Sequence, residues 1–221
     1  MPKRLASLLI LGFSFFCQGN LLAATPAAKT QEIRVIFLGD SIAAGYGVLK
    51  EESFPEVLEH LLSPLALKKN IHLEFTNASV AGSLSSSASS RLRFYLKLKP
   101  QILVLELGGN DVLKGTEALV VRKNLAEAID LALENKMKVL LLGMKIFSNY
   151  GEKYSLAFEK IYRDLANEKK IELMSFLLEG VAFNRDLMQS DQKHPNANGH
   201  KVIAEKLVPF LEPLIIAAIK K

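Results

Sequence analysis

Short apolar runs alternate with longer amphipathic segments along this chain, and this alternation constrains its fold more than any other feature. Residues 33–39 (IRVIFLG) and 138–144 (KVLLLGM) are almost continuously apolar, which is typical of strands buried on both faces. Strands that alternate with helices indicate a parallel sheet covered by helices on both sides, an α/β fold. The expected strands are 33–39, 71–79, 101–111, 138–144 and 171–176, and the expected helices are 54–67, 89–98, 116–136, 152–170 and 196–219, the last with breaks at Pro209 and Pro213.

The amino-terminal segment does not belong to this pattern. Lys3 and Arg4 precede an almost wholly apolar run, residues 5–17, and small residues follow it. This order is typical of a secretory signal peptide, and the run is shorter than the roughly 20 residues that span a membrane. We therefore expect a signal peptide over 1–24, a linker over 25–32, one domain over 33–221, and export to the periplasm or out of the cell.

The sole cysteine, Cys17, lies inside the expected signal peptide. Phe16 precedes it, whereas a lipidated cysteine would follow a small residue. The mature chain would then have no disulfide, no thiolate nucleophile and no cysteine-based metal site. The four histidines are scattered and form no metal-binding pattern, so we expect no metal ion and no other cofactor.

The charge pattern gives little support for a nucleic-acid partner. The formal net charge is +5, from 28 Lys and Arg against 23 Asp and Glu, and removal of Lys3 and Arg4 with the leader lowers it to +3. Basic residues are spread along the chain without a long basic run or interleaved aromatic residues. We expect a monomer with no nucleic-acid partner and at most peripheral contact with a membrane.

Glycines and polar residues gather where the expected strands end. The first strand leads into Gly39-Asp40-Ser41, the second into 77–82 (NASVAG) and the third into 107–111 (LGGND), while 191–196 (DQKHPN) precedes the last helix. Carboxyl ends of parallel strands meet at one edge of the sheet, where ligands bind. Together these segments contain all the groups that an acyl-transfer site needs.

Ser41 is the candidate nucleophile of such a site. A serine hydroxyl attacks an acyl carbonyl only when a base takes its proton, and His194 is the candidate base. Asp191 lies three residues earlier and can hold the other ring nitrogen. The alternatives are a helix N-cap for Ser41 and, for the other two, a polar turn before a helix capped by Asn196. The remaining histidines have no such neighbours and are expected at surface or structural positions: His60, His72 and His200.

The negative oxygen of a tetrahedral intermediate needs hydrogen-bond donors. The candidates are the backbone N–H of Ser41, the backbone N–H of Gly82 and the side-chain amide of Asn110. The alternative for Gly82 is an ordinary turn glycine. Asp40 and Asp111 stand beside these groups, and we expect both to be structural and to bind the amides of turns.

In this order the segments resemble the SGNH hydrolases of the GDSL family. The matching blocks are LGDSIAAGYG (38–47), NASVAG, LELGGND (105–111), NYG (149–151) and HPN (194–196), in the order found in the branch of thioesterase I, lysophospholipase L1 and arylesterase. The resemblance implies a flavodoxin-like three-layer α/β/α sandwich around a parallel five-stranded sheet, no metal ion, and ester or thioester substrates. By the same resemblance the four lettered residues are Ser41, Gly82, Asn110 and His194, with Asp191 as the third member of the triad.

Two departures from the family pattern lie near the expected cleft and concern acyl preference. Ile42-Ala43 stands where many members have Leu-Ser, and a serine-rich run, 83–90, follows Gly82. The apolar loop 144–151 follows the fourth strand at the cleft end. Its apolar residues either line an acyl groove or pack against the next helix. The candidate substrate-binding residues are Met144, Ile146, Phe147 and Tyr150.

Motifs of other site classes are absent from the sequence. It has no Gly-Lys-Ser/Thr phosphate loop, no HExxH, no complete dinucleotide glycine loop and no Gly-x-Ser-x-Gly elbow. The hypothesis is an exported serine hydrolase acting on small-molecule esters or thioesters with modest acyl chains, including lysophospholipids. Two alternatives remain, a sugar or peptidoglycan O-acetylesterase with the same residues, and a non-catalytic binding protein that kept the sheet.

Overall fold

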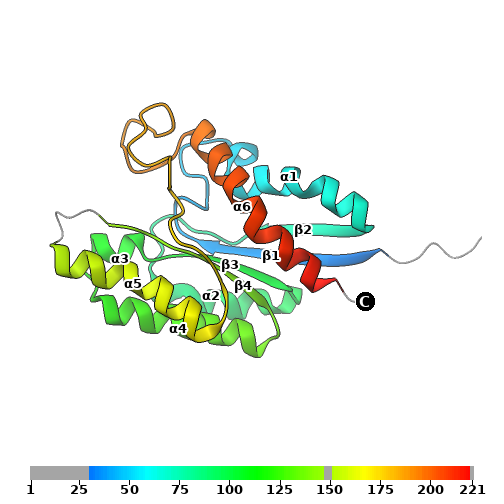
Figure 1. Ribbon diagram of the computed structural model, residues 1–221, viewed down its shortest axis with the longest axis horizontal. Coiled ribbons are helices and arrows are strands. Elements are labelled where there is room, and N and C mark those ends of the chain that lie inside the picture. The colour runs from blue at the N-terminus through cyan, green and yellow to red at the C-terminus, as the bar shows by residue number, and fades with distance from the viewer. Residues whose placement is uncertain (1–29, 147–150, 220–221) are drawn as a thin grey trace, which may run out of the picture.

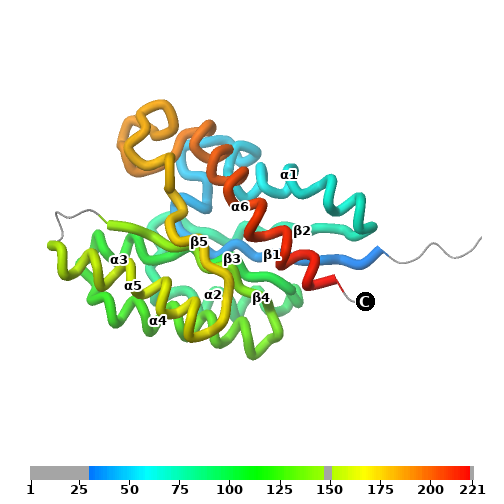
Figure 2. Tube along the Cα trace, viewed as in Figure 1, coloured from blue at the N-terminus to red at the C-terminus, as the bar shows by residue number. Residues whose placement is uncertain are grey.

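The computed structural model describes residues 30–146 and 151–219. Its centre is a five-stranded, wholly parallel sheet in the order β2-β1-β3-β4-β5 (Figure 1). This flavodoxin-like order confirms the fold expected from the sequence. The strands are β1 (Gln31–Gly39), β2 (Ile71–Asn77), β3 (Ile102–Glu106), β4 (Lys138–Leu142) and β5 (Glu172–Met174), the last of which is seen most easily in Figure 2.

Helices cover both faces of the sheet. One face carries α1 (Phe54–Lys69) and α6 (Ala197–Ala218), and the other carries α2 (Ala88–Tyr95), α4 (Ala118–Glu134) and α5 (Glu152–Lys169), as Figure 1 shows. A shorter helix, α3 (Gly109–Leu113), follows β3 directly. Three single-turn 3-10 helices complete the described elements, namely η1 (Lys50–Glu52), η2 (Ser85–Ser87) and η3 (Leu96–Leu98).

Alternation along the strands divides the core in two. On β1, Ile36 and Leu38 pack under α2, α4 and α5, whereas Val35 and Phe37 pack under α1 and α6. All four side chains are buried, because helices exclude water from both faces. The apolar runs recognised in the sequence therefore correspond to strands with two buried faces.

The structure differs from several of the expected element bounds. β1 begins at Gln31, two residues before the expected start and inside the expected linker. The third expected strand, 101–111, is a strand only to Glu106, and its glycine pair turns the chain into α3. The serine-rich run is open to two interpretations from the sequence, a flexible loop or a helix N-terminus; it forms η2 and the first turn of α2, so the second is correct.

The expected breaks in the last helix are wrong. α6 is continuous through Pro209 and Pro213, and both prolines are exposed. The carbonyl groups that lose an N–H partner to a proline can therefore bind water. The opposite side of α6 packs into the core with Leu207, Leu211 and Ile215 fully buried. This packing stabilises the helix enough to offset the cost of the prolines.

The strand register brings the chemically important segments to one edge. Gly39 pairs with Glu106, and Phe37 pairs with Asn77, so the segments that follow β1, β2 and β3 leave the sheet side by side.

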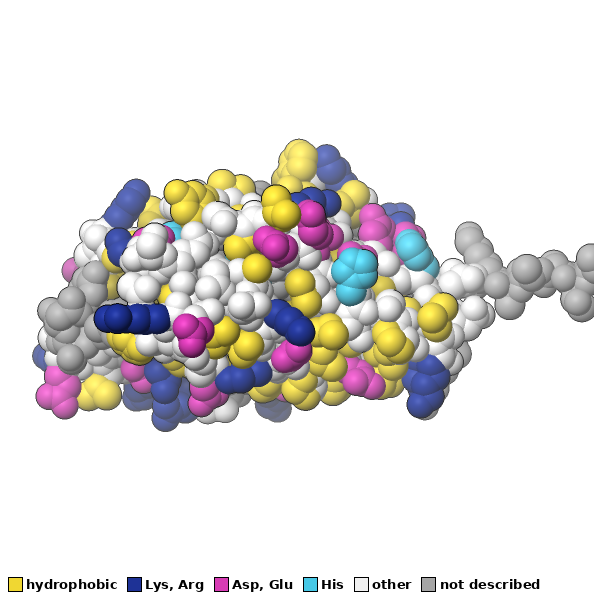
Figure 3. Space-filling view, turned by 90° about the horizontal axis from the view of Figure 1, so that it is seen from above, with side chains coloured by type: hydrophobic (Ala, Val, Ile, Leu, Met, Phe, Trp, Pro, Cys, Tyr) yellow, Lys and Arg dark blue, Asp and Glu magenta, His cyan; other side chains and the backbone are white. Residues whose placement is uncertain are grey.

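No helix among the described residues is long and apolar enough to cross a membrane. On the face seen in Figure 3, basic side chains are interspersed with acidic and apolar ones.

Candidate active site

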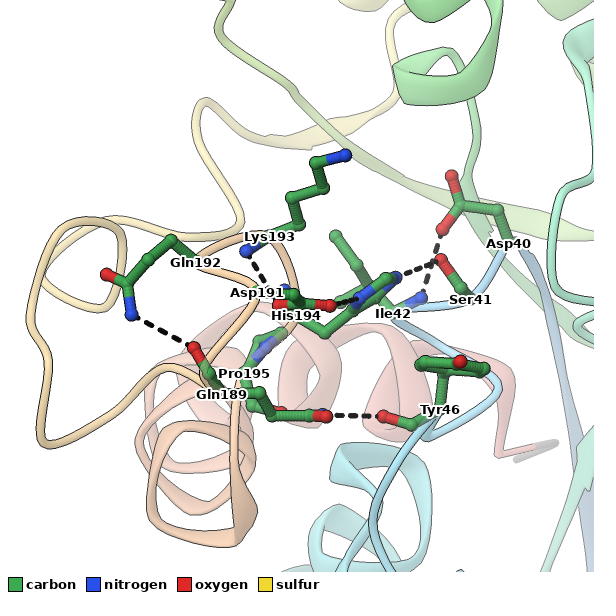
Figure 4. A network of polar contacts seen from close by, with 10 residues as sticks. All are labelled: Asp40, Ser41, Ile42, Tyr46, Gln189, Asp191, Gln192, Lys193, His194 and Pro195. Carbon is green, nitrogen blue, oxygen red and sulfur yellow. Dashed lines mark hydrogen bonds and ion pairs between the residues drawn. The ribbon is translucent and has the colours of Figure 1, made fainter.

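Ser41, His194 and Asp191 form a connected chain of polar contacts at the carboxyl end of the sheet (Figure 4). Ser41 Oγ lies 2.8 Å from His194 Nε2, and His194 Nδ1 lies 2.6 Å from Asp191 Oδ2. The hydrogen bond from His194 lowers the pKa of Asp191 to about 2, so Asp191 is ionised at neutral pH. An ionised carboxylate only accepts hydrogen bonds, so Nδ1 carries a proton and Nε2 of a neutral ring is left to accept one from Ser41.

Local backbone contacts hold the loop that carries the histidine. Asp191 Oδ1 accepts hydrogen bonds from the N–H groups of Lys193 and His194, at 2.9 and 3.0 Å. Asn196 then caps α6 by accepting from Gly199 N at 3.1 Å. One short turn therefore fixes the carboxylate, the imidazole and the start of the helix, which is why a spacing of three residues is sufficient.

Gln189 connects the loop after Ser41 with the loop that carries His194, and sequence reasoning missed it. Its side-chain Nε2 donates to the carbonyl oxygens of Tyr46 and Pro195, at 2.7 and 2.8 Å. Its backbone N–H donates to His194 O at 2.8 Å. The side chain lies so close to Gly47 that a Cβ there would be 2.2 Å from Gln189 Oε1. No sequence motif distinguishes this glutamine, because its role depends on two distant loops.

The turn that carries Ser41 leaves one backbone donor free. Ile42 N donates to Asp40 Oδ1 at 3.0 Å, and Ala44 N donates to Asp40 O at 3.0 Å. The N–H groups of Asp40 and Ala43 donate to a buried carboxyl group, that of Glu106. Within the described part of the chain, the N–H of Ser41 has no hydrogen-bond partner. A free N–H beside the hydroxyl is what a developing oxyanion requires.

Gly82 and Asn110 lie on the wall of the same cavity as Ser41. Gly82 has φ +78°, which a residue with a side chain rarely adopts, and among the described residues its N–H has no hydrogen-bond partner. Asn110 lies in the first turn of α3, and its Nδ2 donates to Asp40 Oδ2 at 3.0 Å and to Ser83 O at 3.1 Å. To bind an oxyanion, this amide must exchange one of those two partners for the substrate.

The acids expected to be structural bind turn amides as predicted. Asp40 is buried, and burial is the main cause that raises its pKa. Asp111 accepts from Ser85 N and Ser85 Oγ, at 2.8 and 2.7 Å. Neither carboxyl contacts the Ser41 hydroxyl. Among the described residues no group of three His, Cys, Asp or Glu could hold a metal ion.

A cavity of about 620 Å³ opens beside Ser41 and His194. Of the four expected substrate-binding residues, Ile146 lies on its wall. Met144 does not, because its side chain is buried in the core under α3, close to Gly109. Phe147 and Tyr150 lie outside the described residues. Ile42, which the sequence placed near the cleft, also lies on the wall. The structure adds apolar wall residues that sequence reasoning did not consider: Val112, Leu113, Phe176, Leu178, Phe183 and Met188.

Two lysines lie on the wall of this mostly apolar cavity. Lys145 and Lys193 are exposed, and among the described residues neither forms an ion pair with a carboxylate. Lys145 Nζ lies 5.4 Å from the ring centre of Phe176. In Figure 4 the Lys193 side chain points away from Gln189 and Gln192. The cavity therefore combines an apolar wall with positive charge.

Comparisons with known proteins identify the family of this chain. The GDSL-like Lipase/Acylhydrolase family model matches residues 37–202. The chain is 34% identical to "Esterase TesA" of Pseudomonas aeruginosa over 196 residues, which cover 88% of this chain and 94% of that protein. It is 31% identical to "Thioesterase 1/protease 1/lysophospholipase L1" of Escherichia coli (strain K12) over 182 residues, covering 82% and 84%.

A solved esterase structure is similar in fold to this chain. The crystal structure of the psychrotrophic esterase EstA from Pseudoalteromonas sp., inhibited by monoethylphosphonate, is similar with a TM-score of 0.75 and 27% identity, covering 81% of this chain and 97% of that one. The family match extends over most of the chain and includes Ser41, Gly82, Asn110, Asp191 and His194. These similarities show that the chain belongs to the GDSL-like lipase and acylhydrolase family, the SGNH hydrolases.

Proposed function

We propose that this protein is an exported serine esterase and thioesterase that forms an acyl-enzyme on Ser41. The observation that carries the proposal is the contact of 2.8 Å between Ser41 Oγ and His194 Nε2, with Asp191 on the far side of the ring. Family membership and the names of the relatives, esterase and thioesterase 1/lysophospholipase L1, support the same reaction class.

The first half of the reaction transfers the acyl group to the enzyme. Ser41 Oγ bonds to the acyl carbonyl carbon while its proton passes to His194 Nε2. Asp191 accepts the Nδ1–H and stabilises the positive ring. The N–H groups of Ser41 and Gly82 and the amide of Asn110 bind the negative oxygen. The bond to the leaving oxygen or sulfur then breaks, and that atom takes the proton from Nε2.

The second half releases the acid. Water gives a proton to His194 Nε2 and its oxygen bonds to the acyl carbon, after which the ester bond to Ser41 breaks and Oγ recovers the proton. Each proton is returned, so no cofactor is consumed.

The cavity wall indicates which esters fit. It is formed mostly by apolar side chains, as an acyl chain requires, whereas an O-acetylated sugar would need more polar partners. Lys145 and Lys193 place positive charge where an anionic leaving group would lie, such as the phosphate of a lysophospholipid or a coenzyme A thioester. The expected substrates are therefore small esters and thioesters of short or medium acyl chains. Monomeric state and export by the leader over 1–24 are expectations from the sequence.

Labelling by a fluorophosphonate probe tests the nucleophile. The probe should add to Ser41 in the wild type, as located by mass spectrometry, and Ser41→Ala should show neither labelling nor turnover of p-nitrophenyl esters from acetate to palmitate or of acyl-coenzyme A. Ser90→Ala is the control, because Ser90 is an exposed serine on α2 that the probe should not label. This variant should be labelled at Ser41 as the wild type is. A Ser41→Ala protein that is folded and still hydrolyses these esters would show that another residue carries the reaction.

A further inference from the structure

Glu106 is a buried carboxyl group that the proposed reaction does not use. It is the last residue of β3, and only 1% of its surface is exposed. The four residues before it in the strand are apolar and buried. Burying a carboxyl group costs free energy unless its oxygens find partners, so its contacts indicate what it stabilises.

Its contacts are with the turn that carries the proposed nucleophile. Glu106 Oε2 lies 3.0 Å from Asp40 N and 3.4 Å from Ala43 N, and both N–H groups donate to it. These two amides flank Ser41 in the sequence. A Cβ on Gly39 would lie 2.4 Å from Glu106 Oε2, so the carboxyl group reaches this position only because residue 39 is glycine.

The effect of these contacts is selective. From Asp40 to Ala44, four of the five N–H groups donate to Glu106 or to Asp40. The N–H of Ser41 is the fifth, and it has no partner among the described residues. Glu106 and Asp40 therefore accept from every N–H of this turn except that of Ser41.

We propose that Glu106 is a positioning residue, which binds the amides on both sides of Ser41 and thereby holds the Ser41 N–H ready for the oxyanion. This inference rests on the proposed function, because it concerns one donor of that oxyanion site. Glu106 hydrogen-bonds to Asp40 N and Ala43 N and not to the Ser41 hydroxyl, and it is not among the described residues that line the cavity.

The surroundings of Glu106 decide its charge. The ionisable side chains that interact with it are acidic, namely Asp40 after β1 and Tyr162 on α5. Burial, and next the negative charge of Asp40, raise the pKa of Glu106 well above its ordinary value. Glu106 Oε1 has no hydrogen-bond partner among the described residues. A neutral acid fits this site, because the hydrogen bond between the carboxyl groups of Glu106 and Asp40 favours the protonated form of Glu106 and the ionised form of Asp40, while Oε2 accepts from the two amides.

Paired substitutions separate positioning from bulk. Glu106→Gln keeps a neutral carbonyl acceptor of the same size, and Glu106→Leu keeps the size and removes the acceptor. We expect kcat of Glu106→Gln for p-nitrophenyl butyrate to stay within about 3-fold of the wild type, whereas Glu106→Leu loses about 10- to 100-fold in kcat with little change in KM. The rate of fluorophosphonate labelling should fall in parallel, because negative charge develops on the phosphonyl oxygen in the transition state of that reaction and needs the same donors.

A second readout tests the neutral acid. Because the folded-state pKa is raised, the folded protein keeps a proton that the unfolded chain releases, so stability falls as pH rises above about 4.5. Glu106→Gln lacks this loss. The melting temperature of Glu106→Gln minus that of the wild type should therefore be larger at pH 8 than at pH 4.5.

Two outcomes would overturn the proposal. Glu106→Leu could keep the wild-type kcat, or Glu106→Gln could lose as much as Glu106→Leu. If Glu106→Leu does not fold, Glu106→Asp replaces it, because the shorter acid reaches the two amides poorly and should also lower kcat. Labelling of Ser41 in the wild type, scored separately, shows whether the proposed function itself has failed.

Discussion

Ser41 Oγ and His194 Nε2 lie 2.8 Å apart, although 153 residues separate them in the sequence. Ser41 follows the first strand, and His194 precedes the last helix. The two come together because α1 and α6 pack side by side on the same face of the sheet, each burying apolar side chains in one cluster. Gln189 then fixes the two loops to each other. The geometry of the site is therefore a consequence of core packing.

The substitution Asp191→Asn tests the tautomer of the histidine. The new side-chain amide could donate to Nδ1, which would move the ring proton to Nε2 and block proton transfer from Ser41. We expect kcat for p-nitrophenyl butyrate to fall by about 100- to 10,000-fold with the fold intact. Asp186→Asn is the matched control, since Asp186 is an exposed acid of the same loop. Equal activity of the two variants would show that Asp191 does not orient His194 for the reaction.

Replacement of Asn110 by alanine tests the third oxyanion donor. Loss of one such donor typically lowers kcat by about 100- to 1,000-fold and leaves KM almost unchanged. Steady-state kinetics with p-nitrophenyl butyrate measures both constants. Asn135→Ala, at the far end of α4, is the control. Because Asn110 also binds Asp40 and Ser83, circular dichroism must show that the variant is folded; a folded variant with unchanged kcat would contradict the assignment.

The parts of the structure that follow local rules were predictable from the sequence. Strands β1, β3 and β4 follow from nearly continuous apolar runs and β2 from alternation, and the triad candidates follow from the chemistry of residues after the first strand and before the last helix. The breaks at Pro209 and Pro213 were wrong because packing in the core outweighs proline propensity on an exposed face. Gln189 and the cavity wall depend on loops that meet only in the folded chain.

Glu106 could be predicted from the sequence only in part. A charged residue within the apolar segment ILVLELGG, 102–109, is an anomaly that the sequence shows. Its contacts with the amides around Ser41 depend on the register of β1 with β3, which pairs Gly39 with Glu106. The sequence therefore shows that Glu106 is an unusual residue for a buried strand, but its contacts become known only from the fold.

The lysines of the cavity wall make a prediction about leaving groups. We expect the double variant Lys145→Gln, Lys193→Gln to lose about 5-fold or more in kcat/KM for the anionic ester 3-butanoyloxy-4-nitrobenzoate. For neutral p-nitrophenyl butyrate the value should stay within about 2-fold, because charge attraction is the only change. Added salt should lower the wild-type preference for the anionic ester.

Lys69→Gln is the control for this comparison. Lys69 is exposed at the carboxyl-terminal end of α1, which leads into the opposite edge of the sheet. It should leave both substrates unaffected. Equal losses for the anionic and the neutral ester in the double variant would mean that the two lysines act on shape or packing and not on charge.

His200 makes a prediction about acid stability. This side chain is fully buried on α6, where Nδ1 accepts a hydrogen bond from Phe54 N at 3.2 Å. Burial, with a smaller effect of His194, lowers the pKa of His200 to about 4. Below pH 6.5 the unfolded chain binds a proton on this residue that the folded protein does not bind. Its contribution to stability is therefore complete above pH 6.5 and is lost as pH falls toward 4, by up to about 3 kcal/mol.

The variant His200→Gln isolates this effect. Glutamine keeps an oxygen that can accept from Phe54 N, and it does not titrate. Glu106 and Asp40 have raised pKa values and change stability in the opposite direction over part of this range, so the quantity to compare is the difference between wild type and variant. Urea unfolding followed by circular dichroism at pH 7.5, 5.5 and 4.5 measures it, since the chain has no tryptophan for fluorescence. We expect the wild type to lose its advantage over His200→Gln as pH falls, whereas His72→Gln, at an exposed position, shows no such trend. A difference that stays constant with pH would mean that burial of His200 does not contribute to the acid sensitivity of the fold.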